Sequence, residues 1–433
     1  MNLDRRSFLR IAAAHAGLSA VRPRPIESAP MTSSPALQLP TSDVVVIGAG
    51  AFGGWTALYL REMGLRVTLV DMYGPGNSRA TSGDETRGIR TAYGDREQWT
   101  RLAHEAIKRW RTFDETWGRD LRMNLFFPTG DLILRARWDN FLAQSKAVHD
   151  RVGVRNEVLT IDEVNYRWPW INTEGFETAY FEFDAGVGRA RRSCEAVAEV
   201  FRHMGGNVII ARAKPGRRTA AGRLETVELE PGGHIAAKDF VFALGPWFPK
   251  SLPDVMANRL RISLGHVYYY GTPPGDNRFT WPNMPSYNVP GTTGWPALGP
   301  DNRGFRVRTG GRGQGDPDDQ VRWIPESYHE RPREILASTF PDMANAPLLE
   351  TRACYYESTV SRNFLIDRYP GLVNAWLVGG GNAEGFKQGP TLGQYAAQRV
   401  MGTNDDPEFM ESFKLAEEEF DAGGGRGGRG GGG

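Results

Sequence analysis

The sequence predicts a mixed α/β protein in which a doubly wound parallel sheet is joined to an antiparallel sheet. An apolar strand over residues 44–47 precedes a glycine-rich turn and a helical stretch, and a second apolar strand over residues 67–70 ends on an acid. This strand–helix–strand order is typical of parallel sheets. Residues 259–270 and 304–309 instead alternate between apolar and polar, as antiparallel strands do.

The glycine-rich turn has the spacing of a dinucleotide-binding cradle. Gly48 permits a tight turn, Gly50 lets the backbone approach a pyrophosphate, and Gly53 lets the helix pack close to the strand. The N-terminus of that helix then faces the phosphate charge. Asp71 ends the second strand roughly 20 residues further on, where an acid accepts a ribose hydroxyl. The sequence therefore predicts nucleotide binding, and the alternative is a glycine-rich turn in an ordinary α/β domain.

The predicted nucleotide-binding domain is discontinuous. Apolar residues at spacings of three and four predict a helix over residues 99–117, and another helix over residues 192–204 precedes a strand. We expect later strands of the parallel sheet at residues 207–210, 239–245 and 375–378, and a closing helix at residues 392–401. The expected division is residues 42–125, 176–255 and 350–402 for the nucleotide domain, and 126–175 and 256–349 for a substrate domain.

Composition excludes several classes of protein. The 433 residues suffice for two domains, and a formal net charge of +1 gives no global field favouring nucleic acid, anionic lipid or acidic substrates. Two cysteines, Cys194 and Cys354, are too few for a disulfide scaffold or a structural zinc site. Cys194 shares a helical face with apolar residues and is interpreted as a core residue. We expect neither a metal site nor a nucleic-acid partner.

Residues 1–41 are interpreted as an export signal and a spacer. Arg5 and Arg6 precede Phe8 and Leu9, and a mildly apolar run follows. This pattern is typical of the twin-arginine signal, by which bacteria export folded proteins. The run is too short and alanine-rich to span a membrane, and no other stretch is long and apolar enough. We expect a periplasmic or extracellular protein without stable membrane insertion; a basic N-terminus without meaning is the alternative.

The C-terminal segment, residues 403–433, ends in a run of glycine and arginine that begins at Gly423. Such a composition cannot bury apolar surface, so we expect disorder. Arg-Gly-Gly segments can bind RNA, but two arginines contribute little to such binding.

Further motifs lie in order between residues 42 and 402. They are Thr86-Arg-Gly-Ile-Arg-Thr-Ala-Tyr-Gly94, Arg352-Ala-Cys-Tyr-Tyr-Glu-Ser358 followed by Asn363-Phe-Leu-Ile-Asp367, Gly385-Phe-Lys387 and Gly389-Pro-Thr-Leu-Gly393. Together they resemble the monomeric sarcosine oxidase family, of the D-amino-acid-oxidase type. The resemblance implies an FAD-binding doubly wound domain, an antiparallel substrate domain, and oxidation of secondary or primary amines of amino acids to imines. Members of the family usually pass the electrons to oxygen.

Several residues match functional positions of that family. Arg90 and Lys387 match two cations that hold the substrate carboxylate, and a forked guanidinium suits that task. Fixing the carboxylate would place the reacting C–H bond over the flavin. Arg87 matches an arginine beside the flavin, and Tyr356 a tyrosine of the substrate pocket. The alternatives are a surface salt bridge for Arg87, a solvated loop lysine for Lys387 and a core tyrosine for Tyr356.

The resemblance also implies the contacts of the cofactor. Cys354 matches a cysteine that bonds covalently to the flavin ring; a buried hydrophobe without that bond is the alternative. The residues expected to contact FAD are Gly48, Gly50, Ala51, Phe52, Gly53, Asp71, Ser82, Thr86, Arg87, Gly245, Trp247, Cys354, Gly385, Phe386 and Lys387.

Three positions depart from the family pattern. Arg306 stands where the family has a lysine near the flavin that is thought to activate oxygen. Arginine keeps the positive charge, but its planar group changes water placement and cannot lose its proton, so efficient reaction with oxygen is in doubt. Glu384 and Gly310 stand where the family often has histidines, so the substrate pocket should differ from that for sarcosine.

We therefore expect an FAD-dependent oxidoreductase that oxidises the C–N bond of a small amine by hydride transfer to flavin N5. The expected substrate is an amino acid. Arg90, Arg306, Tyr356 and Lys387 are its candidate catalytic residues, and a helix beginning near Thr391 would stabilise the reduced flavin. Oxygen is the expected electron acceptor. The alternatives are an exported amine dehydrogenase with another acceptor, and a non-catalytic binding protein with an Arg/Gly tail.

Overall fold

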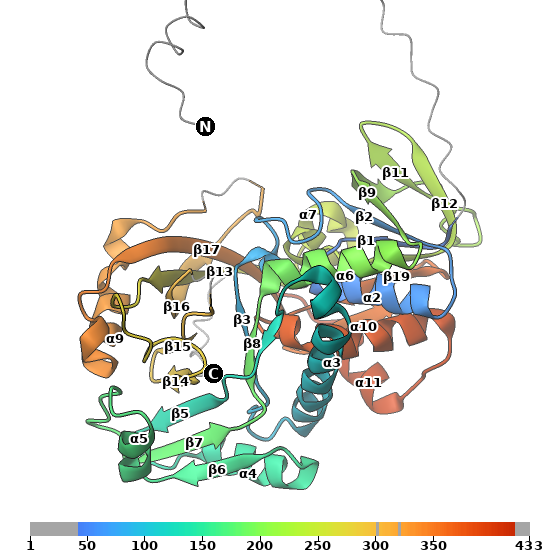
Figure 1. Ribbon diagram of the computed structural model, residues 1–433. Coiled ribbons are helices and arrows are strands. Elements are labelled where there is room, and N and C mark those ends of the chain that lie inside the picture. Colours follow the sequence, from blue (N-terminus) through green and yellow to red (C-terminus); the bar gives the residue numbers. More distant parts are fainter. Residues whose placement is uncertain (1–41, 300–302, 319–321, 421–433) are drawn as a thin grey trace, which may run out of the picture. The chain divides into compact units, whose positions relative to one another are not determined.

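The computed structural model describes residues 42–299, 303–318 and 322–420 (Figure 1). Contacts divide the chain into two units, Met1–Leu37 and Gln38–Gly433, and every described residue belongs to the second. The predicted export signal and the Gly/Arg run from Gly423 lie outside the described residues. Within the described ranges, no helix combines the length and the apolar character that crossing a membrane requires.

The first sheet is mainly parallel and carries the glycine-rich turn. Its strands are, in spatial order, β9 (Asn207–Ile210), β2 (Val67–Asp71), β1 (Ser42–Ile47), β12 (His234–Phe242), β19 (Ala375–Gly379) and β18 (Leu365–Arg368). β18 alone in this series pairs antiparallel. The first half of β12 also pairs with a hairpin made of β10 (Arg212–Pro215) and β11 (Thr226–Glu230). The apolar residues 44–47 are buried, as expected for a central parallel strand, and the doubly wound fold is confirmed.

Four helices cover this sheet or pack on the helices that cover it. They are α2 (Ala51–Glu62), α3 (Glu97–Leu121), α6 (Ala190–His203) and α10 (Gly385–Met401). One apolar cluster joins them to the sheet, including Val46 of β1, Trp110 of α3, Val197 of α6 and Leu392 of α10. This cluster is the core that holds the glycine-rich turn in place.

The expected start of the closing helix is wrong. We expected it near Thr391, but α10 begins at Gly385 and runs through Pro390. A proline inside a helix removes a backbone hydrogen bond and normally ends the helix. Here one face of the helix packs directly on α2: a Cβ at Gly393 would lie 2.4 Å from Cβ of Trp55. We infer that this packing outweighs the cost of the proline, and it places Lys387 in the first turn of the helix.

The second sheet has eight strands and is antiparallel except at one pair. Its order is β17 (Leu348–Thr359), β13 (Leu260–Tyr270), β16 (Phe305–Gln314), β15 (Thr292–Trp295), β14 (Ser286–Val289), β5 (Asp131–Arg135), β7 (Thr178–Glu182) and β6 (Asn156–Leu159). Only β14 and β5 run parallel in this series. The expected antiparallel strands around residues 259–270 and 304–309 are confirmed as β13 and β16.

Two strands from segments assigned to the nucleotide domain belong to this second sheet. β7 pairs with β5 and β6, and β17 pairs with β13 along its whole length. A third sheet of β3 (Arg87–Ile89), β8 (Gly186–Gly188) and β4 (Phe126–Phe127) lies between the two larger ones (Figure 1). The remaining α-helices are α4 (Asn140–Val152), α5 (Ile161–Arg167), α7 (Phe248–Ser251), α8 (Pro253–Met256), α9 (Glu330–Thr339) and α11 (Pro407–Ser412).

Candidate active site

A cleft with about 1090 Å³ of empty volume opens at the carboxyl ends of β1 and β2. Ligands of open α/β sheets bind at this edge of the sheet. The predicted cofactor-contacting residues that line the cleft are Gly48, Gly50, Ala51, Phe52, Asp71, Ser82, Arg87, Gly245, Trp247, Gly385 and Phe386. Residues far apart in the sequence therefore converge on one elongated site.

The glycine-rich turn has the geometry that its sequence predicts. Gly48 has a φ of +106°, and a Cβ there would lie 2.2 Å from the carbonyl oxygen of Ala243. A Cβ at Gly53 would lie 1.9 Å from the carbonyl oxygen of Gly48, so the helix and the turn touch through backbone atoms. Gly50 is the N-cap of α2, and the Ala51 N–H donates a hydrogen bond to Ser82 Oγ over 3.2 Å.

Asp71 ties the end of β2 to the turn. Its Oδ2 accepts a hydrogen bond from the Ala49 N–H at 2.7 Å, and its Oδ1 accepts from the N–H groups of Tyr73 and Gly74. Burial raises the pKa of this carboxyl group, and the three backbone hydrogen bonds oppose the rise. A carboxylate has about four acceptor sites, so one of them is available to a ribose hydroxyl.

Glu357 lines the same cleft and was missed by the sequence analysis. Its Oε1 accepts a hydrogen bond from the Gly381 N–H at 3.0 Å. Its Oε2 is buried without a partner among the described residues, and a Cβ at Gly245 would lie 4.0 Å from that atom. Burial raises the pKa of Glu357, and backbone hydrogen bonds lower it. An unpartnered buried carboxyl oxygen fits a hydroxyl or N–H donor of a bound molecule.

A second cavity, with about 630 Å³ of empty volume, adjoins the cleft. Both cavities share Arg87, Tyr356 and Ala383 in their walls. The charged residues of the second cavity are Arg87, Arg90, Arg306, Arg308, Lys387 and Glu384, and Cys354 also lines it. All four candidate catalytic residues thus lie around one space.

Two predicted contact residues do not line either large cavity. Thr86 bonds instead to Tyr269, with 3.0 Å between the two hydroxyl oxygens, and accepts a hydrogen bond from Trp295 Nε1. It lines a separate small cavity beside Trp295. Gly53 is buried where the helix meets the turn, so it lets these two segments pack closely rather than contacting the cofactor itself.

Lys387 and Glu384 form an ion pair at the start of α10. The Tyr93 hydroxyl donates a hydrogen bond to Glu384 Oε2 over 3.3 Å, and Lys387 Nζ lies 5.4 Å from the centre of the Tyr93 ring. Burial lowers the pKa of Lys387, and Glu384 opposes this change. Burial raises the pKa of Glu384, but attraction to Lys387, Arg90 and Arg308 lowers it further than burial raises it. Glu384 therefore carries a negative charge among three cations.

Arg90 follows β3 and is half-buried. Among the described residues its guanidinium makes no hydrogen bond or ion pair, although it lines the cavity. Burial lowers its pKa, while Glu384 and Asp131 raise it by a larger amount. Arg90 is therefore a charged, directional donor that faces open space.

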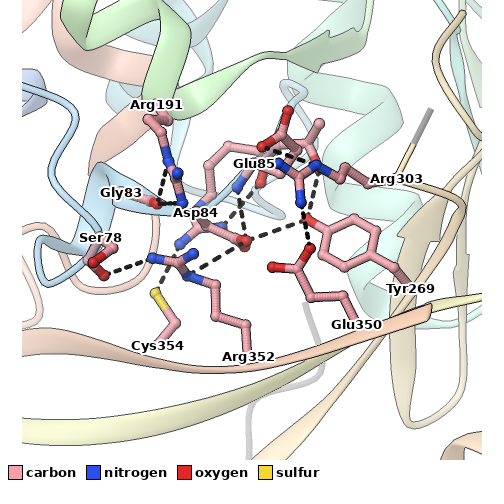
Figure 2. Close-up of polar contacts among 12 residues, drawn as sticks. Ser78, Gly83, Asp84, Glu85, Arg191, Tyr269, Arg303, Glu350, Arg352 and Cys354 are labelled. Atoms are coloured by element: carbon pink, nitrogen blue, oxygen red, sulfur yellow. Dashed lines mark hydrogen bonds and ion pairs between the residues drawn. The ribbon is translucent and has the colours of Figure 1, made fainter. Parts of the chain in front are cut away.

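Asp84 is the buried centre of an arginine cluster (Figure 2). It forms an ion pair with Arg87, and its carboxyl oxygens lie 3.7 Å from Arg306 Nη2 and 3.8 Å from Arg352 Nε. The Tyr269 hydroxyl donates to Asp84 Oδ1 over 3.2 Å. Burial raises the pKa of Asp84, but the three arginines outweigh it and lower the pKa to about 2. Asp84 was missed because it lies in a polar loop without periodicity.

Arg306 is 2% exposed and stacks on Trp295, with its guanidinium carbon 3.8 Å from the ring centre. Its Nε and Nη1 have no hydrogen-bond partner among the described residues. Burial lowers its pKa, while Tyr269 and Asp84 raise it. Arg308, two residues further along β16, was also missed; its alternation with Arg306 on one strand was the available signal.

Cys354 lies on β17 and is buried. Its Sγ accepts a hydrogen bond from Arg87 Nη2 over 2.8 Å. Cys194 is buried in α6, where burial raises the pKa of its thiol to about 12, as expected for a core residue. The two cysteines thus have different surroundings: Cys354 lines the second cavity, and Cys194 lines neither the cleft nor that cavity.

Residues 43–399 match the family model of FAD-dependent oxidoreductases. The chain belongs to this family. It is 26% identical over 377 residues to the peroxisomal sarcosine oxidase of Homo sapiens, covering 83% of this chain and 92% of that protein. It is 26% identical over 389 residues to the N-methyl-L-tryptophan oxidase of Salmonella dublin, covering 86% and 98%. The crystal structure of glycine oxidase from Bacillus cereus superposes with a TM-score of 0.73 at 17% identity, covering 87% and 99%.

The cofactor of this FAD-dependent oxidoreductase is FAD, and the cleft fits it. The glycine-rich turn leaves room for a pyrophosphate at the start of α2, where a Cβ at Gly50 would meet only Ser82 Oγ, at 3.8 Å. The unpartnered oxygen of Glu357 and the free acceptor site of Asp71 offer places for hydroxyl groups. The predicted family, fold class, cofactor and oxidoreductase class are therefore confirmed.

Proposed function

We propose that this protein oxidises the C–N bond of a secondary or primary amine of an amino acid. The observation that carries the proposal is the cation-lined cavity that adjoins the FAD cleft and shares wall residues with it. The names of its relatives, sarcosine oxidase and N-methyl-L-tryptophan oxidase, describe oxidases of N-methylated amino acids and support the same reaction class.

In this proposal, charged side chains of the protein hold the substrate. Arg90 binds the substrate carboxylate through two hydrogen bonds, and Lys387 donates to the same carboxylate from the first turn of α10. Glu384 accepts a hydrogen bond from the amine, and Tyr356 packs against its carbon atoms. FAD, when bound, supplies the acceptor of a hydride equivalent at N5. Fixing both ends of the substrate reduces its freedom to the reactive orientation.

Oxygen is the proposed acceptor, and a dehydrogenase with another acceptor is the second candidate. The observation that favours the second candidate is the stacking of Arg306 on Trp295, since a guanidinium held flat against a ring places water differently from a lysine ammonium. Peroxide released in step with substrate consumption would exclude the dehydrogenase. A non-catalytic binding protein would leave the flavin unreduced by every amine.

We also propose that Cys354 forms a thioether with the flavin, in which the S–H bond and one C–H bond of the flavin are broken and the two electrons released pass through the flavin to its electron acceptor. We further propose that residues 1–41 direct twin-arginine export. The cavity-facing position of Cys354 and its hydrogen bond from Arg87 support the first. The paired Arg5 and Arg6 before an apolar run support the second. Export of a folded protein would allow the cofactor to be loaded beforehand.

Aerobic turnover of the purified full-length holoenzyme tests the proposed function. Sarcosine, N-methyl-L-alanine and L-alanine are supplied, and amine loss, carbonyl product and peroxide are quantified, with an artificial electron acceptor in parallel. We expect carbonyl product to form in proportion to amine loss with at least one acceptor. Failure of every secondary and primary amino acid with both acceptors would contradict the proposal.

A further inference from the structure

The second cavity contains more positive charge than a substrate with one carboxylate requires. Five cations line it, and Glu384 is the single carboxylate among its described lining residues. Glu384 pairs with Lys387, Asp84 behind the wall pairs with Arg87 and Arg306, and the buried Asp131 attracts Arg90 without forming an ion pair with it. Arg90 and Arg308 remain as two guanidinium groups without a hydrogen bond or ion pair from their side chains among the described residues.

Arg308 is directed toward the cavity by the register of β16. The strand pairs Arg308 with Val267 of β13 and with Thr293 of β15, and both partners line the same cavity. The alternate residues Phe305 and Val307 pack into the apolar cluster on the other face of the sheet. The backbone of Arg308 is held by its N–H donating to Thr292 Oγ1 over 3.3 Å.

The guanidinium of Arg308 lies beside Gly265, within van der Waals range of the position that a Cβ would take there. A Cβ at Gly265 would lie 3.6 Å from Nε and Nη2 of Arg308, and 3.7 Å from Cε1 of Tyr356. The group therefore lies beside Tyr356, in the wall shared with the FAD cleft. On the same face of β16, a Cβ at Gly310 meets nothing within 4 Å, so there is room beyond Arg308.

We propose that Arg308 binds a second carboxylate of the substrate, so that the preferred substrates are N-substituted amino acids with two carboxylates. The inference rests on the proposed amine oxidation and names its substrate class. Arg90 takes the carboxylate next to the reacting carbon, and Arg308 takes the one on the side chain or on the N-substituent. A guanidinium that faces a partly desolvated cavity gains most from an ionised, bidentate partner.

Binding of redox-inert anions to the full-length holoenzyme tests this assignment. Oxydiacetate has two carboxylates and methoxyacetate has one, and each has an ether oxygen in place of the amine. Their dissociation constants are measured from the change in flavin absorbance. We expect oxydiacetate to bind about 10- to 100-fold more tightly, the value of one charged hydrogen-bonded contact.

Variants of Arg308 distinguish a direct contact with the second carboxylate from a general electrostatic attraction of anions to the cavity. Arg308→Gln should abolish the preference for oxydiacetate and leave methoxyacetate binding within about twofold, and Arg308→Lys should retain part of the preference. Arg331→Gln, which removes an exposed arginine of α9 paired with Glu334, should retain all of it. Equal binding of both anions by the wild type, or equal weakening of both by Arg308→Gln, would overturn the proposal.

A second arm distinguishes this inference from the proposed function. N-methyl-L-aspartate should reduce the flavin anaerobically faster than N-methyl-L-asparagine in the wild type, and the difference should vanish in Arg308→Gln. Equal rates for the two amines in the wild type would contradict the substrate class while leaving amine oxidation intact. If neither these nor any other amine reduces the flavin while the oxydiacetate preference persists, amine oxidation is contradicted and the anion site at Arg308 stands.

Discussion

Arg87 donates a hydrogen bond from Nη2 to the Sγ atom of Cys354 over 2.8 Å, and the same guanidinium is paired with the buried Asp84. The thiol lines the second cavity, and Arg87, which lines both cavities, places a fixed positive charge beside it. This position supports the proposed attachment of the flavin at Cys354.

Cys354→Ala should release the flavin on denaturation. We expect acid-precipitated wild type to keep its yellow colour in the pellet, and the variant to lose it to the supernatant. Cys194→Ala is the matched control, because Cys194 is buried in α6 and lines neither cavity, so this variant should leave the colour in the pellet. Wild-type colour found only in the supernatant would contradict the covalent bond and leave FAD binding intact.

Arg306→Lys should accelerate reoxidation of the reduced enzyme by oxygen, by about tenfold or more. A lysine ammonium is a compact, strongly hydrated charge, whereas Arg306 is stacked flat on Trp295. Arg306→Gln, which removes the charge, should slow the same step. Stopped-flow mixing of reduced enzyme with oxygenated buffer measures the rate. An unchanged rate in both variants would show that this side chain does not control oxygen reactivity.

Asp84→Asn should destabilise the folded protein by about 3–5 kcal/mol, because it leaves Arg87 and the buried Arg306 and Arg352 without their shared anion. The free energy of unfolding is measured in urea. Asp316→Asn is the control: it removes one partner of Lys250 at the surface, where an ion pair contributes about 1 kcal/mol or less. Similar losses in the two variants would contradict the role given to Asp84.

Asp131 should make stability depend on pH. Burial raises its pKa to about 7, against the attraction of Arg90. Because the folded pKa lies above the unfolded value, its stabilising contribution is complete below pH 3.8 and is lost as the pH rises through about 7. Between pH 5 and pH 8, the free energy of unfolding of the wild type should fall by on the order of 2 kcal/mol relative to that of Asp131→Asn.

Urea unfolding at the two pH values measures this difference. Asp150→Asn is the control. Lys146 lowers the pKa of Asp150, so this carboxyl group is already ionised at pH 5 and its charge does not change between the two pH values. A difference between wild type and Asp131→Asn that stays constant from pH 5 to pH 8 would contradict the raised pKa.

Local patterns in the sequence were sufficient for the parts of the fold that depend on local geometry. Gly48 and Gly53 adopt the contacts expected of them because backbone approach at a turn depends on residues close in sequence. The start of α10 was not predictable from its own segment. Pro390 normally ends a helix, and the packing of Gly393 against Trp55 that offsets it comes from a distant helix.

The candidate site shows the same division. Arg90, Arg306 and Lys387 were found because motifs around them resemble a known family, and the structure brings them around one cavity. Asp84 and Glu357 were missed because their partners are distant in the sequence. Asp84 bonds to Tyr269, 185 positions away, and Glu357 bonds to Gly381, 24 positions away. No periodic signal marks an acid whose partners come from other strands.

Anaerobic single-turnover reduction of the bound FAD tests the central claim most directly. Wild-type holoenzyme is mixed with N-methyl amino acids without oxygen, and the absorbance of oxidised flavin is followed, with dithionite as the control for reducible cofactor. We predict that at least one such amine bleaches the flavin, and that Arg90→Gln lowers the apparent affinity for that amine by about tenfold or more. A flavin that dithionite bleaches but no amine reduces would contradict the account.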